Sequence, residues 1–254
     1  MTALLTTQQL NLQIAHQLIC RNFDFNMYAG ETIGFLGPNG FGKTTLLHTL
    51  AGFIKPISGT ILIEGKNIFN QSARELAKKR GVLFQQTHAA FPRTVYEYCM
   101  SGRYPHQKAF FHASRHDDEK VRHALQVMEL DNRLQQNVQT LSGGELRRLA
   151  IATVLAQAPH IYLLDEPLNH LDPRHQMNVF THLKKLAKEE GASILMTLHD
   201  PYMLRHHCSH VLLPMEHGTL LKDSPAKILT AENLSYVYNI PLKEMRGSLW
   251  QYGY

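Results

Sequence analysis

The residues best suited to chemistry lie in a glycine-rich stretch, 37–45, between two apolar runs. Its pattern is G-x-x-x-x-G-K-T, in which glycines allow successive backbone N–H groups to turn inward around an anion. The helix expected after this loop would point the positive end of its dipole at the same place. Lys43 can reach β- and γ-phosphate oxygens, and the Thr44 hydroxyl can coordinate Mg²⁺. We predict a polyphosphate site formed by Gly37, Pro38, Asn39, Gly40, Phe41, Gly42, Lys43, Thr44 and Thr45.

Two adjacent carboxylates, Asp165 and Glu166, follow the apolar stretch 161–164. Side chains alternate along a strand, so the two acids would point to different sides at the carboxyl end of a sheet, where α/β proteins bind ligands. Asp165 can hold Mg²⁺, and Glu166 can polarise the water that attacks a γ-phosphorus. Many strands also end in acidic residues at an ordinary solvent-exposed turn. The pair therefore indicates a binding site only in combination with the phosphate loop.

A third candidate is the segment Leu-Ser-Gly-Gly-Glu at 141–145. Ser142 is a good helix N-cap, and Glu145 stands at capping-box spacing. The helix N-terminus that they begin could bind a second anion. A well-capped helix without any ligand explains the same residues equally well.

Hydrophobic periodicity predicts the elements that position these residues. Alternation at 10–14 and, less strictly, at 19–27 predicts antiparallel strands. Strands and helices then alternate around the phosphate loop, which is typical of a parallel sheet with right-handed crossovers. We expect core strands within 32–36, 81–84, 161–165 and 193–198, a short strand within 56–65, and helices at 72–80 and 172–190.

Strand signals stop between 86 and 158. Apolar residues at three- and four-residue spacing there predict helices at 94–100, 117–128 and 142–157. We therefore expect an α/β fold with N-terminal antiparallel strands, a parallel core sheet and an inserted helical subdomain.

The composition is that of an ordinary globular protein of 254 residues, 44% of them apolar. No apolar run approaches the roughly 18 residues that a membrane-spanning helix needs, and the first residues lack a secretory-signal pattern. Cys20, Cys99 and Cys208 lie far apart, so we expect reduced thiols in a cytoplasmic protein.

The formal net charge is +5, and the chain has 16 histidines. Nucleic acid or an anionic membrane would suit this charge, but the lack of a dense Lys/Arg block favours a mildly basic enzyme. Two loose histidine groups, at 106–116 and 206–210, lack a convincing set of further ligands, which argues against a structural metal site.

Taken in order, these motifs resemble those of the ATPases of ABC transporters. The segment 141–145 is similar to the signature sequence of that family, Gln85 to its loop glutamine, and His199 to the histidine after its last core strand. Leu171 and Asp172 match the loop after the acidic strand. The resemblance covers essentially the whole chain and implies one ABC ATPase domain with a P-loop NTPase fold. Its parts would be a nucleotide-binding core lobe at 1–85 and 159–228, a helical subdomain at 86–158 and a C-terminal tail at 229–254.

The resemblance further implies a head-to-tail homodimer with two ATP molecules and Mg²⁺ at the interface. Gln85 would contact Mg²⁺ and the attacking water, His199 would contact the γ-phosphate, and Glu166 would be the base. For His199, a purely structural role at the strand end is the alternative. Asp172 would help to join the two sites. Mg²⁺ would be held by Thr44, Gln85 and Asp165, and each ATP by the phosphate loop of one subunit and Ser142, Gly143 and Gly144 of the other.

Two positions depart from the family pattern. Ile14 stands about where the family often has an aromatic residue that stacks on adenine, so His16 or apolar packing would contact the base instead. Phe41 fills a loop position that usually holds a small residue. Because the backbone binds the phosphates, we expect function to survive, with the Phe41 side chain near the closing interface.

Three further segments resemble one subgroup, the ATPases of importers for ferric siderophores, haem and cobalamin: 91–95, 101–106 and 229–241. The resemblance implies an integral membrane permease whose short cytoplasmic helix would enter a groove around 85–103. A solute-binding protein would act through that permease. The chain would then be a peripheral protein on the cytoplasmic face of the inner membrane, with no nucleic-acid partner.

Alternatives stay open at this point. The three segments could be generic amphipathic helix surface. The ATPase could serve another transport substrate, or act on DNA or ribosomes without a permease. A basic nucleic-acid-binding protein that merely uses ATP is a further class, which salt-dependent binding would reveal.

Overall fold

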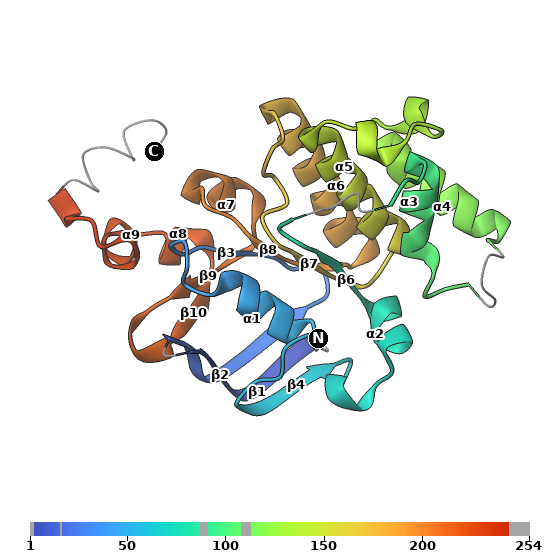
Figure 1. Cartoon of the computed structure of the whole chain (residues 1–254). Helices are drawn as coiled ribbons and strands as arrows, with labels where there is room; N and C mark the ends of the chain where they lie inside the picture. Colours follow the sequence, from blue (N-terminus) through green and yellow to red (C-terminus); the bar gives the residue numbers. More distant parts are fainter. Residues whose placement is uncertain (1–2, 16, 87–90, 108–112, 244–254) are drawn as a thin grey trace.

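Two β-sheets and helices on both faces of the larger sheet make up the fold (Figure 1). The structure is a computed structural model that describes residues 3–15, 17–86, 91–107 and 113–243. The four-stranded sheet is antiparallel, with strand order β2-β1-β4-β5. Its strands are β1 (Ala3–Ile14), β2 (Gln17–Tyr28), β4 (Ser58–Ile63) and β5 (Lys66–Asn67).

The six-stranded sheet has the order β10-β9-β3-β8-β7-β6. Its neighbours pair in parallel from β9 to β6, and β10 adds an antiparallel edge. Parallel strands need crossovers, which the helices supply. The strands are β3 (Thr32–Phe35), β6 (Arg80–Leu83), β7 (Ile161–Leu164), β8 (Ser193–Thr197), β9 (His210–Pro214) and β10 (Leu220–Asp223).

The helices lie on both faces of this sheet (Figure 1). They are α1 (Lys43–Leu50), α2 (Ala73–Lys79), α3 (Val95–Met100), α4 (Arg115–Val127), α5 (Gly143–Gln157), α6 (Pro173–Glu190), α7 (Pro201–His207), α8 (Pro225–Ile228) and α9 (Ala231–Tyr238). Short 3₁₀ turns are η1 (Ile68–Asn70), η2 (Ser101–Arg103), η3 (Asp131–Arg133), η4 (Val138–Thr140) and η5 (Glu216–Gly218).

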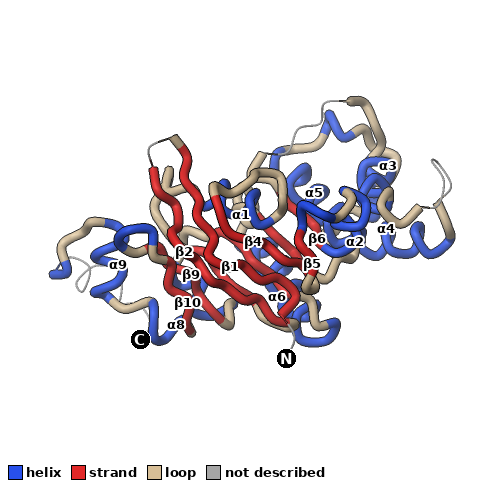
Figure 2. The backbone as a smooth tube through the Cα atoms, turned by 90° about the horizontal axis from the view of Figure 1, so that it is seen from below, coloured by secondary structure: helices blue, strands red, loops and turns tan. Residues whose placement is uncertain are grey.

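Alternate side chains of the central strands face two hydrophobic clusters, as a period of two requires. Ile161 and Leu163 of β7 belong to the cluster around α1 and the antiparallel sheet, which we call the first cluster. Tyr162 and Leu164 belong to the second cluster, which includes residues of α3 to α9. Figure 2 shows the antiparallel sheet from below, with α3 and α4 to one side of it and α9 to the other.

The predicted fold class is confirmed: a parallel sheet, N-terminal antiparallel strands and a helical region between β6 and β7. Helix boundaries differ by a few residues. For example, α4 begins at Arg115 because Ser114 and Asp117 form a capping box. Strands β9 and β10 have no counterpart among the expected elements. Within the described part of the chain, no helix is long and apolar enough to cross a membrane.

Candidate nucleotide site

The phosphate loop turns from the buried strand β3 directly into the N-terminus of α1. Gly40 has a φ of 78°, and Gly42, the N-cap of α1, has a φ of 102°. A Cβ atom on Gly42 would also lie 2.2 Å from Ile19 Cδ1. Only glycine fits both the backbone angle and the space. The free N–H groups of this helix end form an anion-binding geometry.

Lys43 lies inside the loop, with 6% of its surface exposed. Its ammonium donates to the carbonyls of Gly37 at 2.8 Å and Pro38 at 2.9 Å. Burial lowers the pKa of Lys43, while the charges of Glu166 and Asp165 oppose that shift. A phosphate group would supply the full counter-charge that the loop carbonyls do not.

Phe41 points into the molecule. Its ring packs against the first cluster and meets Phe35 edge-on at 6.2 Å between centroids, while its place near a closing interface stays a prediction. Gln17 Nε2 donates to the Phe41 carbonyl at 3.2 Å, which ties the loop to β2. Ile14, at the end of β1, is 40% exposed, and His16 lies outside the described residues.

Asp165 is buried beside the end of β8, with 1% of its surface exposed. The Thr197 hydroxyl donates to Asp165 Oδ1 at 2.7 Å and accepts from the Glu166 backbone N–H at 2.7 Å. Asp165 Oδ2 is buried and has no hydrogen-bond partner among the described atoms. An orphaned carboxylate oxygen is costly, and a hydrated cation would satisfy it.

Glu166 lies at the centre of a polar cluster on the other side of the acidic pair. Its Oε1 is 2.7 Å from His199 Nε2, and its Oε2 accepts from Gln85 Nε2 at 3.1 Å. Asn169 Nδ2 also donates to Oε2. The Glu166 backbone has a φ of 46°, in the left-handed region that costs a non-glycine residue energy. Such strain is typical of functional sites.

The pKa of Glu166 is set by opposing effects. Burial alone would raise it, but the hydrogen bond and charge of His199, the hydrogen bond from Gln85 and the charge of Lys43 together lower it. The carboxylate is therefore ionised at neutral pH, as a group that accepts a proton from water must be.

The residues present fit Mg²⁺. The ion prefers oxygen ligands and retains several waters. Thr44 lies in the first turn of α1, half-buried, and Gln85 is exposed where β6 ends. With the unpartnered Asp165 Oδ2, these groups could supply hard oxygen ligands.

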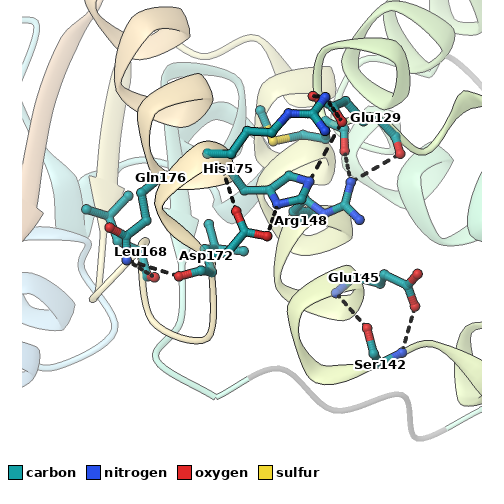
Figure 3. A network of polar contacts seen from close by, with 11 residues as sticks. Glu129, Ser142, Glu145, Arg148, Leu168, Asp172, His175 and Gln176 are labelled. Carbon is teal, nitrogen blue, oxygen red and sulfur yellow. Dashed lines mark hydrogen bonds and ion pairs between the residues drawn. The ribbon is translucent and has the colours of Figure 1, made fainter.

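The segment that begins α5 forms a complete capping box. Glu145 N–H donates to Ser142 Oγ at 3.3 Å, and Ser142 N–H donates to Glu145 Oε2 at 2.8 Å (Figure 3). Ser142 and Gly143 are exposed. A Cβ atom on Gly144 would lie 2.9 Å from the His170 carbonyl, so this helix end packs closely against the loop before α6.

Asp172 begins α6 and lies in a second polar network. Its Oδ1 accepts from the His175 N–H at 2.9 Å, and its Oδ2 is 2.8 Å from His175 Nδ1. Glu129, which follows α4, approaches His175 Nε2 at 3.8 Å from the other side (Figure 3). The hydrogen bonds from His175 are the main cause that lowers the pKa of Asp172. The loop before α6 is thereby connected to the helical region.

The structure brings together Gln85, Asp165, Glu166 and His199, which lie far apart in sequence, and places the charge of Lys43 beside the two acids. Ser142, Gly143, Gly144 and Asp172 form a separate group at the starts of α5 and α6. Sequence reasoning missed Thr197 and Asn169. Thr197 had one usable signal: it is a polar residue at the end of an apolar strand, two positions before His199.

Comparison with known proteins agrees with this geometry. The family model described as ABC transporter matches residues 20–169. The chain is 34% identical to the ferric enterobactin transport ATP-binding protein FepC of Escherichia coli over 94% of this chain and 88% of that protein. It is 33% identical to the iron(3+)-hydroxamate import ATP-binding protein FhuC of Bacillus subtilis over 93% and 88%. The hemin import ATP-binding protein HmuV of E. coli O157:H7 is 29% identical over 96% and 95%.

Solved structures show the same fold. The cbiO1 protein of Clostridium perfringens, part of the ABC transporter complex cbiONQ, superposes with a TM-score of 0.76 at 26% identity, covering 96% of this chain and 98% of that one. A dimeric ATP-binding cassette bound to ADP and Pi superposes with a TM-score of 0.74 at 24% identity, covering 87% and 98%. The chain therefore belongs to the ABC transporter family, as an ATP-binding subunit that hydrolyses ATP.

Proposed function

We propose that this subunit powers a binding-protein-dependent importer of an iron chelate such as a ferric siderophore, of haem or of cobalamin. The single observation that supports hydrolysis most strongly is the ionised Glu166 carboxylate between Gln85 and His199, next to Asp165. The relatives with this fold whose names include ferric enterobactin, iron(3+)-hydroxamate and hemin support the substrate class.

Each site residue has a distinct role in this proposal. The backbone of 37–45 cradles the phosphates, and the Lys43 ammonium moves from the loop carbonyls to the β- and γ-phosphate oxygens. Glu166 orients and deprotonates the attacking water, which Gln85 also contacts, and His199 donates to the γ-phosphate. Thr44, Gln85 and Asp165 would hold Mg²⁺, and the bound ion would neutralise phosphate charge.

A second copy of the chain completes each site. The exposed helix end at Ser142, Gly143 and Gly144 would meet the γ-phosphate held by the partner's loop, because a helix N-terminus favours an anion. Asp172, beside that helix end, would join the two sites. Residues 1–85 and 159–228 would act as the nucleotide-binding lobe, 86–158 as the helical subdomain and 229–254 as the tail.

The permease would dock on the helical subdomain. A cavity of ≈ 410 Å³ there is lined by Arg93, Tyr96, Glu97, Met100 and Tyr104, among others, and this mixed apolar and charged lining suits an amphipathic helix. Phe84, next to Gln85, is 46% exposed and stacks on Phe53, so it offers a further apolar contact for the permease. The chain would thus sit on the cytoplasmic face of the inner membrane.

The test replaces the chromosomal gene with a Glu166→Gln allele. Because the amide cannot accept the water proton, we expect ATP turnover to fall at least about 100-fold with ATP binding kept. Growth with one iron chelate, with haem or with cobalamin as the only source of the nutrient that it supplies should be lost, as it is in the deletion strain. Glu189→Gln, whose side chain is 60% exposed on α6, is the matched control and should grow normally. Wild-type turnover by Glu166→Gln would contradict the catalytic role, and unimpaired growth of the deletion strain on all three sources would contradict the importer assignment.

A further inference from the structure

The guanidinium of Arg147 lies between the two loops that carry Gln85 and Glu166. Arg147 belongs to α5 and is 3% exposed. Its Nη1 donates to the Phe84 carbonyl at 2.6 Å and the Gln85 carbonyl at 3.3 Å. One side chain of the helical region thus contacts the chain as it leaves β6.

The other side of the same guanidinium contacts the chain as it leaves β7. Nη2 donates to the carbonyls of Asp165 at 2.5 Å and Glu166 at 2.6 Å, and Nε donates to the Pro167 carbonyl at 3.4 Å. The planar fork of arginine makes such a bridge possible, because its donors point in fixed, divergent directions.

The Arg147 bridge connects the chains that leave β6 and β7 beyond the end of the sheet. The last backbone bond between the two strands runs from Asp165 N–H to the Leu83 carbonyl at 2.9 Å. Beyond it the chains diverge, and their carbonyls need other donors. Arg147 therefore connects the main chains that carry Gln85 and Glu166, in addition to the direct hydrogen bond from Gln85 Nε2 to Glu166 Oε2 at 3.1 Å.

The charge of Arg147 is unusual for its surroundings. Among the described residues, its hydrogen-bond acceptors are all backbone carbonyl oxygens. Burial lowers the pKa of Arg147 to about 10, opposed by the charges of Asp165 and Glu166, so the group stays protonated at neutral pH. A buried cation bonded only to carbonyls has a high energetic cost, which calls for a role beyond simple packing.

We infer that Arg147 is a positioning residue for ATP hydrolysis: it holds Gln85 and Glu166 at the separation that orients the attacking water, and links both to the helix that begins at Ser142. This inference rests on the proposed function. It predicts that loss of the guanidinium impairs the chemical step far more than ATP binding, because neither loop contact involves 37–45.

The experiment measures steady-state ATP hydrolysis by the full-length Arg147→Ala variant. We expect kcat to fall about 100-fold, the size of effect that small misplacement of reacting groups causes, with KM for ATP changed less than about threefold. Added guanidinium chloride at non-denaturing, low-millimolar concentration should restore kcat about tenfold by filling the vacated space, while methylammonium chloride, which has no fork, should not.

Two further variants keep the test decisive. Arg147→Lys preserves the charge, but a single ammonium cannot span both sets of carbonyls, so kcat should still fall even if Arg147→Ala folds poorly. Arg148→Ala removes a neighbouring arginine whose Nη1 donates instead to Met128 and Glu129 carbonyls, and guanidinium should not raise its rate.

The possible outcomes distinguish failure of this inference from failure of the proposed function. Wild-type kcat in Arg147→Lys, or a folded Arg147→Ala variant that guanidinium does not rescue, would overturn the inference while wild-type turnover and its dependence on Glu166 stand. If the wild-type protein does not hydrolyse ATP, or if the Glu166→Gln variant hydrolyses ATP at the wild-type rate, the proposed function on which the inference depends is overturned instead.

Discussion

At the scale of single residues, one hydroxyl organises the acidic pair. Thr197 is fully buried, donates to Asp165 Oδ1 and accepts from the Glu166 N–H, each at 2.7 Å. It thereby keeps one Asp165 oxygen occupied and leaves the other available to a cation. It also supports the Glu166 backbone in its left-handed conformation.

Thr197→Val removes this hydroxyl without changing the side-chain shape. We expect the free energy of unfolding to fall by about 1–3 kcal/mol, because a buried carboxylate oxygen and an N–H lose their partner. Thr49→Val is the control: Thr49 is equally buried, but its hydroxyl bonds only the Thr45 carbonyl of its own helix, so the loss should be about 1 kcal/mol or less. Urea unfolding of both variants measures the difference, and equal losses would contradict the role given to Thr197.

The sequence identifies some site residues and not others for a physical reason. Gly42, Lys43 and Ser142 belong to local motifs, a phosphate loop and a helix cap, which leave a pattern in consecutive residues. Thr197 and Arg147 act on strands and loops far away in the chain, and Arg147 acts on carbonyls that every residue has. Nothing in the sequence marks the partners of Arg147, and the only signal for Thr197 is its place at the end of an apolar strand.

At the scale of elements, a buried ion pair joins three pieces of the helical region. Arg103, in η2, donates to Asp117 Oδ1 at 2.8 Å, with side-chain exposures of 5% and 6%. Its Nη1 also donates to the carbonyls of Ala156 at 2.9 Å and Gln157 at 3.1 Å, at the end of α5. Since Asp117 also caps α4, this pair fixes the ends of two helices against one turn.

Asp117→Ala leaves the Arg103 charge buried without its partner. We expect a loss of about 3–5 kcal/mol in the free energy of unfolding. Glu119→Ala, two positions along the same helix, breaks only the exposed pair with Arg115 and should cost about 0.5 kcal/mol. Thermal and urea unfolding compare the two, and a loss below 1 kcal/mol for Asp117→Ala would show that the pair contributes little.

The elements themselves are mostly readable from the sequence. Long periodic stretches such as α5 and α6 and the capping box at Ser142 lie where the pattern predicts them. β9 and β10 have no such signal, because a short apolar run without clear alternation does not distinguish a buried strand from a buried helix segment. Their pairing at the sheet edge, next to β3, is decided by tertiary contacts.

At the scale of the whole molecule, the two anion-binding helix ends belong to different parts of the fold. α1 packs into the first cluster and α5 into the second, on opposite faces of the six-stranded sheet (Figure 1). In the proposed function, one chain therefore offers two half-sites. In our account, a second chain brings the Ser142 end of its α5 to the phosphate loop, and nucleotide binding becomes a switch for closure.

The most direct test of this account is the mass of the Glu166→Gln protein, measured by light scattering after size exclusion with and without MgATP. We predict a monomer without nucleotide and a dimer with it, and no dimer when Ser142→Arg is added, although ATP still binds. Ser72→Arg, which removes the equivalent cap from α2, is the control and should still dimerise. A Glu166→Gln, Ser142→Arg protein that dimerises with ATP as readily as Glu166→Gln alone would contradict the claim that the second chain completes the site.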